Sequence, residues 1–319
     1  MKNNIPLPLK EIDKIEIYTV IDNYVDILLT DTPIVSRPRM DKNGKIQTTT
    51  LLAEHGLSLI INLFRKGKKE TVLFDTGYSD IGVLNNLNLL GIDLDSINAM
   101  VLSHGHMDHT GSVNCILDSM QNKIPLVAHP DIFLYPRYIQ LEDGIKRTFP
   151  QVLSEEKLKQ KNIDLLLSTT PTLLADDTLL VTGEVERVTD FEKGLPNAFV
   201  EINGKTEKDN IKDDQSLVVN LKGKGLVVIS GCSHSGIINT LFFARKITGI
   251  EKIHAVFGGF HLSGSFFEKI LEKTIKEFDK INPEILVPMH CTGWKATKQF
   301  YDHFPDSFIL NSVGSKYTP

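Results

Sequence analysis

Cysteine is scarce in this sequence: three residues, Cys115, Cys232 and Cys291, are scattered over 319 positions. So few thiols cannot supply the paired framework that holds small secreted domains together. A disulfide-stapled protein is therefore excluded. Two of the three, Cys232 and Cys291, stand beside histidines, which indicates chemistry at a site rather than cross-linking.

Long apolar runs and an excess of positive charge are also missing. No uninterrupted stretch approaches the roughly 20 apolar residues that cross a bilayer, and Met1–Lys14 lacks the apolar run of a signal peptide. We therefore expect no membrane segment and a reducing, cytoplasmic setting. The formal net charge of -5 argues against nucleic acid as a partner, because proteins that bind nucleic acids usually carry a basic face.

Short β-branched runs, bounded by Gly, Pro, Asn or charged residues, recur along the chain and are typical of strands. They predict strands at 15–21, 57–64, 71–75, 100–103, 126–129, 179–182, 216–221, 225–230, 253–257 and 284–288. The runs 216–221 and 225–230 are separated by a short loop around Gly223, which predicts a β-hairpin.

Apolar residues at helical spacing predict helices at 79–90, 235–247 and 265–281, the first followed by Gly91 and the last by Pro283. Residues 130–176 differ in character, since they mix aromatic and basic side chains with a charged, helix-like stretch. We expect a single domain spanning 1–319, in which 130–176 is an insertion that forms a substrate wall or lid.

The segment His104-Gly105-His106-Met107-Asp108-His109 is the strongest functional signal, and it directly follows an apolar strand pattern. Residues two apart in an extended segment point the same way, so His104 and His106 can bind one metal ion. Asp108 and His109, beyond a turn, can face a second metal ion. Imidazole and carboxylate ligands suit zinc, iron or manganese. Ten histidines in the whole chain rarely cluster so tightly, which disfavours a polar turn without a metal.

Later histidines repeat the arrangement, because Cys232 with His234, then His261, then His290, each follow a predicted strand. Loops at strand ends are where such folds assemble their sites, and four such segments favour one shared site. His55 precedes a strand and is either a site residue or a cap. The remaining histidines fit ordinary structural positions: His129, His254 and His303.

The segment 103–111 carries the HxHxDH pattern and resembles the signature of the metallo-β-lactamase superfamily. Asp75, in Leu73–Gly77, is similar to that superfamily's Asp-Thr-Gly strand end behind the metal ligands. The later motifs at 231–234, 258–261 and 290–293, with 54–56, resemble the branch of 7,8-dihydropterin-6-methyl-4-(β-D-ribofuranosyl)aminobenzene-5′-phosphate synthase-like proteins. The resemblance implies an α/β (α+β) fold: an αββα sandwich of two mixed β-sheets flanked by helices, with the metal site at one edge.

The sequence departs from the superfamily at the first metal, where a third histidine and a bridging aspartate are usual. Cys232 stands at the place of the bridging aspartate, and Asp214 lies where the histidine is expected. The resemblance then implies that His234 supplies the missing nitrogen and that His290 completes the second metal. Asp214 or Cys232 is the alternative ligand, and Cys232 is a bridge, a support for the ligands or simple packing.

Two metals about 3.5–4 Å apart lower the pKa of a shared water and clamp both oxygens of a displacement. We therefore expect a dinuclear metal-dependent hydrolase, zinc being the favoured metal, whose metal-bound hydroxide attacks a phosphoester or related anionic small molecule. Asp108 would orient that hydroxide, and His261 would protonate the leaving group or support a ligand. Side chains of the insertion either meet the anion or form a solvated surface: Tyr135, Arg137, Tyr138, Lys146 and Arg147.

A different reaction class fits the same ligands. The resemblance implies a transferase that condenses a pterin diphosphate with a ribosyl-aminobenzene phosphate, with water excluded from the site. The ligand motif cannot separate hydrolase from transferase. The complete His104–His109 ligand set does argue against a binding protein that kept the fold and lost the chemistry. A homo-oligomer is compatible with the sequence.

Overall fold

The computed structural model describes residues 6–39, 41–42 and 44–319. The N-terminal segment in which no signal peptide is predicted spans Met1–Lys14, and its residues 1–5 lie outside the described residues. None of the helices in the described part of the chain combines the length and apolar character needed to cross a membrane.

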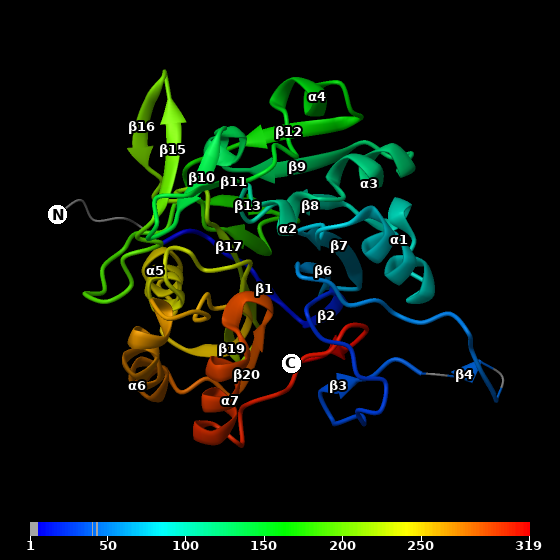
Figure 1. Cartoon of the computed structure of the whole chain (residues 1–319). Helices are drawn as coiled ribbons and strands as arrows, with labels where there is room; N and C mark the ends of the chain where they lie inside the picture. Colours follow the sequence, from blue (N-terminus) through cyan, green and yellow to red (C-terminus); the bar gives the residue numbers. More distant parts are fainter. Residues whose placement is uncertain (1–5, 40, 43) are drawn as a thin grey trace.

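Two mixed sheets form the centre of the molecule (Figure 1). In the described residues, the eight-stranded sheet has the order β12 (Ile163–Leu167), β9 (Ile124–Ala128), β8 (Ala99–Val101), β7 (Lys68–Phe74), β6 (Ser58–Arg65), β2 (Lys14–Ile21), β21 (Lys316–Tyr317) and β3 (Val35–Ser36). The seven-stranded sheet has the order β13 (Thr172–Leu174), β14 (Leu179–Val181), β17 (Ser216–Leu221), β18 (Gly225–Ser230), β19 (Ile253–Gly259) and β20 (Ile285–Met289), and β1 (Glu11–Ile12) also pairs with β17.

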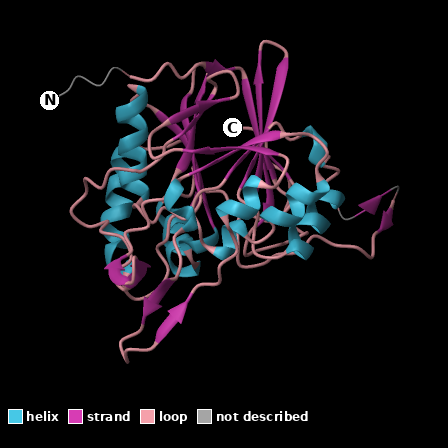
Figure 2. Cartoon of the chain, turned by 90° about the horizontal axis from the view of Figure 1, so that it is seen from above, coloured by secondary structure: helices cyan, strands magenta, loops and turns pink. Residues whose placement is uncertain are grey.

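Helices lie outside the strands, as the view from above shows (Figure 2). The α-helices are α1 (Asp80–Leu89), α2 (Met107–Thr110), α3 (Val113–Ser119), α4 (Glu155–Lys159), α5 (Ile237–Thr248), α6 (Leu271–Ile281) and α7 (Trp294–His303). Short 3₁₀ turns are η1 (Leu94–Ser96), η2 (Pro130–Phe133), η3 (Phe267–Ile270) and η4 (His290–Thr292).

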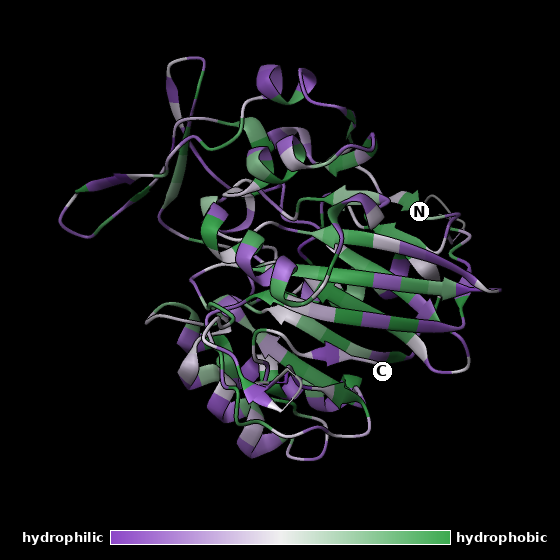
Figure 3. Cartoon of the chain, turned by 90° about the vertical axis from the view of Figure 1, so that its right-hand side faces the viewer, coloured by the Kyte–Doolittle hydropathy of each residue, from purple (hydrophilic) through white to green (hydrophobic). Residues whose placement is uncertain are grey.

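Alternation along the strands explains the layers. In β18, Val227 and Ile229 pack into the core between the sheets, whereas Leu226 and Val228 pack outward beneath α5 and α6. In β7, Val72 and Phe74 face the same inner core. Because successive strand residues point to opposite faces, strands that are apolar on both sides need a cover on both sides. The predicted αββα sandwich is confirmed, and Figure 3 shows its hydrophobic strands beneath more polar loops.

Most predicted strands and the β17–β18 hairpin are present with ends shifted by a few residues. Helix α1 also agrees with the prediction, since Ser79 caps its first turn and Gly91 follows with a φ of 67°. The helix predicted at 235–247 begins later, at Ile237, because Gly236 has a φ of 99° that a helix does not allow. The helix predicted at 265–281 is divided into η3 and α6.

A smaller sheet stands apart from the sandwich. In the described residues it has the order β11 (Lys146–Thr148), β10 (Arg137–Gln140), β15 (Ala198–Ile202) and β16 (Lys205–Lys208), and the β15–β16 hairpin rises above the body (Figure 1). The predicted insertion at 130–176 contributes β10 and β11 to this sheet, whereas its later strands β12 and β13 belong to the two main sheets. A separate hairpin pairs β4 (Asp41–Lys42) with β5 (Lys45–Ile46).

Candidate metal centre

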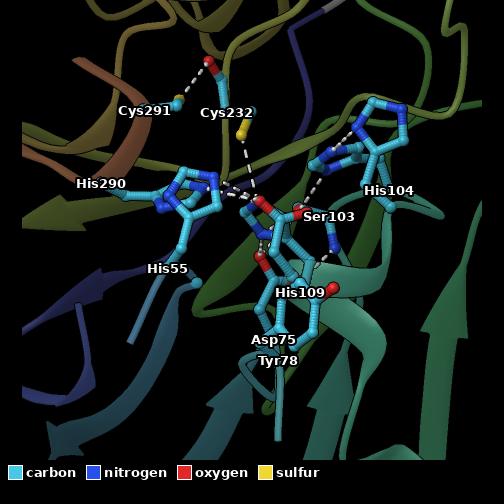
Figure 4. Close-up of polar contacts among 12 residues, drawn as sticks. His55, Asp75, Tyr78, Ser103, His104, His109, Cys232, His290 and Cys291 are labelled. Atoms are coloured by element: carbon cyan, nitrogen blue, oxygen red, sulfur yellow. Dashed lines mark hydrogen bonds and ion pairs between the residues drawn. The ribbon is translucent and has the colours of Figure 1, made fainter. Parts of the chain in front are cut away.

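The chemistry-bearing side chains meet at one edge of the sandwich (Figure 4). His104 follows β8, Cys232 and His234 follow β18, His261 follows β19, and His290 follows β20. Strands β7 and β8 are parallel, as are β18, β19 and β20, so the carboxyl ends within each set lie together. Sites in such sheets form at the carboxyl ends of strands, because the loops there converge.

The first ligand group consists of His104, His106, His234 and Cys232. The Nε2 of His104 lies 2.9 Å from the Nδ1 of His106 and 3.2 Å from the Nε2 of His234. The Cys232 Sγ lies within 4.8 Å of the ligand nitrogens of His104 and His234. All four residues are buried. Two nitrogens from one loop and one from the opposite sheet therefore converge on one point.

The second ligand group consists of Asp108, His109, His290 and again Cys232. The Nε2 of His290 lies 3.2 Å from the Nε2 of His109 and 3.2 Å from the Oδ2 of Asp108. The Cys232 Sγ lies 3.1 Å from the Nε2 of His109. His55 approaches from the open side, with its Nε2 3.5 Å from the Asp108 Oδ2. Cys232 thus belongs to both groups and lies where a bridging ligand would stand.

The histidine loop is fixed by a buried ion pair. Asp213 accepts a hydrogen bond from the backbone nitrogen of Gly105 at 2.8 Å and two from the guanidinium of Arg137, at 2.9 and 2.6 Å. Arg137 also contacts Asp209 at 2.9 Å. Because both acids and the guanidinium are buried, this arrangement is costly to break and holds the backbone between His104 and His106 in place.

Asp75 orients His109 from behind. Its Oδ2 lies 2.6 Å from the His109 Nδ1, and it also accepts hydrogen bonds from the backbone nitrogen and the hydroxyl of Ser103, both at 2.7 Å. A carboxylate on Nδ1 fixes the imidazole tautomer and leaves Nε2 free to bind a metal. The Asp-Thr-Gly strand end therefore supports a ligand and is not one itself.

Asp22 and Asn23 support His290, and the sequence analysis missed both. The Oδ1 of Asp22 accepts a hydrogen bond from the His290 backbone nitrogen at 2.8 Å, and the Asn23 Oδ1 lies 3.1 Å from the His290 Nδ1. The Asn23 amide also donates to the His290 carbonyl at 3.2 Å. The signal in the sequence is a polar pair directly after the first long strand, which resembles the strand ends that were recognised.

Electrostatics differ between the groups. Burial lowers the pKa of His104 and His234 well below the ordinary value and that of His106 to about 4, so these imidazoles are neutral near pH 7. At His109 the carboxylates of Asp75 and Asp108 overcome burial and raise the pKa to about 9. Burial opposes ionisation of Asp108, but His109 and His290 hold its pKa below the usual range.

The donor set fits divalent metal ions. Ring nitrogens that face each other at 2.9 and 3.2 Å repel unless a proton or a cation lies between them. Neutral imidazole is the form that binds metals, and nitrogen, sulfur and carboxylate donors together suit zinc or iron. The histidines expected to bind each metal are thus brought together as the sequence indicated.

Comparison with known proteins agrees with this geometry. Residues 55–189 match the family model of the metallo-beta-lactamase superfamily. The chain is 33% identical over 301 residues to the 7,8-dihydropterin-6-methyl-4-(beta-D-ribofuranosyl)-aminobenzene-5'-phosphate synthase of Methanocaldococcus jannaschii. The aligned region covers 93% of this chain and 94% of that protein. The chain belongs to the metallo-β-lactamase superfamily. An uncharacterized protein of the same organism is 32% identical over 82% of this chain and 92% of its own length.

Solved structures show the same fold. A crystal structure described as a metal-dependent hydrolase of the β-lactamase superfamily superposes with a TM-score of 0.70 and 28% identity, covering 95% of this chain and 98% of that one. The metallo-β-lactamase fold protein YhfI from Bacillus subtilis has a TM-score of 0.51 and 11% identity, covering 96% of this chain and 100% of that one.

His234 and Asp214, two candidates for the missing ligand of the first metal, take different positions in the structure. His234 lies against His104, whereas Asp214 accepts a hydrogen bond from the backbone nitrogen of Ser235 at 2.9 Å and belongs to neither ligand group. Burial raises the pKa of Asp214 to about 6 despite hydrogen bonds from the backbone of His234 and Ser235. Asp214 thus stabilises the turn that carries His234.

His261 lies beside the first ligand group. Its ring centroid is 4.2 Å from that of His234 and 4.7 Å from that of Phe267. Its backbone has a φ of 46°, and its Nδ1 is buried without a hydrogen-bond partner. Ligand atoms of His261, Cys232 and Cys291 also lie within 4.8 Å of one another. Either role expected for His261, proton donor or support of a ligand, is compatible with this position.

An open cavity of about 420 Å³ leads to both ligand groups. Its far wall is formed by Ile139, Phe149, Leu195 and Asn197, which come from the smaller sheet and its connections. The ring centroid of Phe149 lies 4.7 Å from that of His106. Part of the segment 130–176 therefore faces the metal centre and narrows its entrance.

The basic and aromatic residues expected to meet a substrate anion do not line this cavity. Arg137 is neutralised by Asp209 and Asp213. Tyr138 is buried, stacks on Phe199 and is covered by the ammonium of Lys146, and Arg147 is an exposed residue of β11. Arg137 and Tyr138 are therefore held by internal contacts, and the exposed Arg147 fits the alternative of a solvated surface. A cationic side chain in a sequence does not reveal whether an internal carboxylate already pairs with it.

Proposed function

We propose that this protein is a metal-dependent hydrolase that cleaves a phosphoester on a small anionic molecule. The observation that carries the proposal is the pair of ligand groups joined at Cys232 on the floor of one open cavity. His104, His106 and His234 would hold one divalent ion, and Asp108, His109 and His290 the other. When bound, such ions would lower the pKa of a water and offset charge on the phosphoester.

The residues of the chain supply orientation and protons. Asp108, whose pKa is held low, accepts a hydrogen bond from the attacking water and directs its oxygen toward phosphorus. The phosphorus–oxygen ester bond breaks on the opposite side, and His261 donates a proton to the departing oxygen. The proton that the attacking water loses passes to solvent, and His261 takes up a proton from solvent before the next turnover. Phe149 and Phe267 give the cavity an apolar wall beside the ligand groups.

The charges of the residues that line the cavity favour a substrate anion that is bound through metal ions. The described residues that line it include neither lysine nor arginine. Phosphate charge would therefore be offset by the ions and by neutral donors, including Asn197 and Ser263. The carboxylates of the ligand Asp108 and of Asp75, which supports His109, would repel a phosphate in the absence of a cation.

A transferase is the second candidate. The 33% identity over 93% of the chain with a synthase of a dihydropterin–ribofuranosyl-aminobenzene phosphate favours it. In that reaction the amino nitrogen of a ribosyl-aminobenzene phosphate would attack the methylene carbon of a pterin diphosphate. The bond between that carbon and the diphosphate oxygen would break, the diphosphate would leave, and the nitrogen would lose one proton. The same ligand groups would serve, with the cavity closed to water.

Metal analysis and turnover test the proposal together. Protein purified without chelator is expected to carry two divalent ions and to hydrolyse bis-p-nitrophenyl phosphate or p-nitrophenyl phosphate. His106→Ala and Asp108→Ala are each expected to reduce turnover about 10³-fold, since several kcal/mol of transition-state stabilisation would be lost. Asp306→Asn, an exposed carboxylate distant in sequence from the ligands, is the matched control.

Two results would contradict the proposal. Protein without bound metal would remove the metal-dependent reaction altogether. A metal-loaded protein that leaves both phosphoesters intact, but forms product when pterin diphosphate and ribosyl-aminobenzene phosphate are supplied together, would establish the transferase instead.

A further inference from the structure

A second cavity adjoins the metal centre and is flanked by two exposed aromatic side chains. Trp294, the single tryptophan of the chain, is 77% exposed, and Tyr24 is 42% exposed. Both line a cavity of about 480 Å³. Its remaining wall is largely apolar and includes Met289 and Leu310.

This cavity adjoins the metal cavity. Asn23, His290 and Gly293 line both of them. His290 belongs to the second ligand group, and Asn23 contacts the Nδ1 of His290 at 3.1 Å. The second ligand group therefore lies at the boundary between the two cavities, next to the cavity that Tyr24 and Trp294 line.

The backbone holds both aromatic residues beside His290. Trp294 starts α7 directly after Gly293, whose φ of 78° favours glycine, and a Cβ at Gly293 would lie 2.6 Å from that of Ser263. Tyr24 directly follows Asn23, and its hydroxyl donates to the Asp26 carboxylate at 2.9 Å. These constraints set the position of each aromatic residue relative to the metal centre.

The chemistry of the second cavity selects a neutral, planar group. The acid in its wall, Asp22, is buried, and its carboxylate already accepts hydrogen bonds from His290, Asn23 and Asn311. Neither lysine nor arginine occurs among the described lining residues. Indole and phenol faces gain most from an aromatic ring that stacks on them and removes them from water.

We propose that Trp294 and Tyr24 form an aromatic subsite that binds the planar ring of the substrate, while its phosphate lies at the metal centre. This inference rests on the proposed function and adds the substrate class: a phosphate carried by an aromatic ring system. It accounts for an indole exposed at a cavity that adjoins the metal centre, a position where a smaller polar residue would serve solubility better.

Calorimetric titration of the metal-loaded protein tests the subsite with two phosphonates that hydrolysis cannot cleave. The 1-naphthylphosphonate probe carries a ring, and methylphosphonate does not. The wild-type protein is expected to bind the naphthyl probe about tenfold more tightly than the methyl probe, on the scale of stacking plus apolar burial. Trp294→Ala is expected to remove most of this ratio, and Trp294→Phe to retain most of it.

Tyr301→Ala is the matched control, because Tyr301 is 57% exposed on the same helix and does not line the cavity. The subsite is overturned if the ratio in Trp294→Ala equals that in Tyr301→Ala. If wild-type protein does not bind methylphosphonate at all, the proposed function fails instead. Titration of 1-naphthol into wild type and Trp294→Ala then decides on the aromatic subsite alone: equal affinities reject it, and a severalfold loss supports it.

Discussion

The two ligand groups are built on different physical principles. The first group presents three neutral imidazoles, because burial lowers the pKa of His104, His106 and His234. The second contains the carboxylate of Asp108 and is backed by that of Asp75. A divalent cation is therefore attracted to the second group by charge, and to the first mainly by the positions of its nitrogens.

Because of this difference, metal binding at the two groups should respond differently to substitution. The second group stores a proton on His109, whose pKa of about 9 means that a metal must displace it. The first group has no such proton on its histidines near pH 7, and both groups depend on loops from both sheets. Charge removal should weaken the second group, and loss of a shared ligand should weaken both.

Among the substitutions that compare the two groups, replacement of Cys232 should have the largest effect, because its Sγ belongs to both groups. We expect Cys232→Ala to lower phosphodiester turnover about 10²-fold or more and to reduce the bound metal, measured by mass spectrometry of the metal content. Cys232→Asp restores the carboxylate usual at this place in the superfamily and should retain more metal than the alanine variant. Cys115→Ala on α3 is the control. Full metal content in Cys232→Ala would reduce Cys232 to packing.

Substitution of the supporting carboxylates should separate the two groups. Asp75→Asn is expected to weaken metal binding at the second group about 10–100-fold, because His109 loses its charged partner. Asp214→Asn should weaken binding at the first group about threefold or less, since Asp214 contacts backbone rather than an imidazole. Competition with a chelating dye measures both affinities, and thermal unfolding checks that each variant is folded. Equal losses would contradict the contrast between charged and neutral groups.

Outside the two ligand groups, a prediction about stability concerns Glu192, which accepts hydrogen bonds from the first turn of α5, the helix that follows the His234 turn. Burial raises the pKa of Glu192 from 4.5 to about 7 against those hydrogen bonds. Its contribution to stability is therefore complete below about pH 4.5 and is lost as the pH rises through about 7.

Urea unfolding at pH 5 and pH 8, with a chelator present, tests this dependence. From pH 5 to pH 8 the wild-type protein should lose about 2–3 kcal/mol more than Glu192→Gln, which cannot ionise. The buried histidines titrate alike in both proteins, so the difference isolates Glu192. Parallel pH profiles for the two proteins would reject the raised pKa.

Local patterns determined much of this protein. Short β-branched apolar runs located the long strands within a few residues, because a strand that is buried on both faces is apolar at successive positions of its own sequence. The same strands ended in Cys232, His234, His261 and His290, so convergence at one edge followed from parallel pairing. Helix α7 was missed, since its buried positions, Ala296 and Phe300, are few and follow a glycine-containing turn.

Tertiary structure alone decided which side chains are already paired. Arg137 and Asp213 are 76 residues apart, and their buried ion pair turns an expected substrate contact into a support for the histidine loop. Asp22 and His290 are 268 residues apart, and no periodicity joins them. The residues along the chain fixed which groups can bind a metal, because ligand chemistry is local. The folded chain decided which of them meet, which carboxylate stands behind each, and where Trp294 lies, because those contacts depend on distances that a linear pattern does not contain.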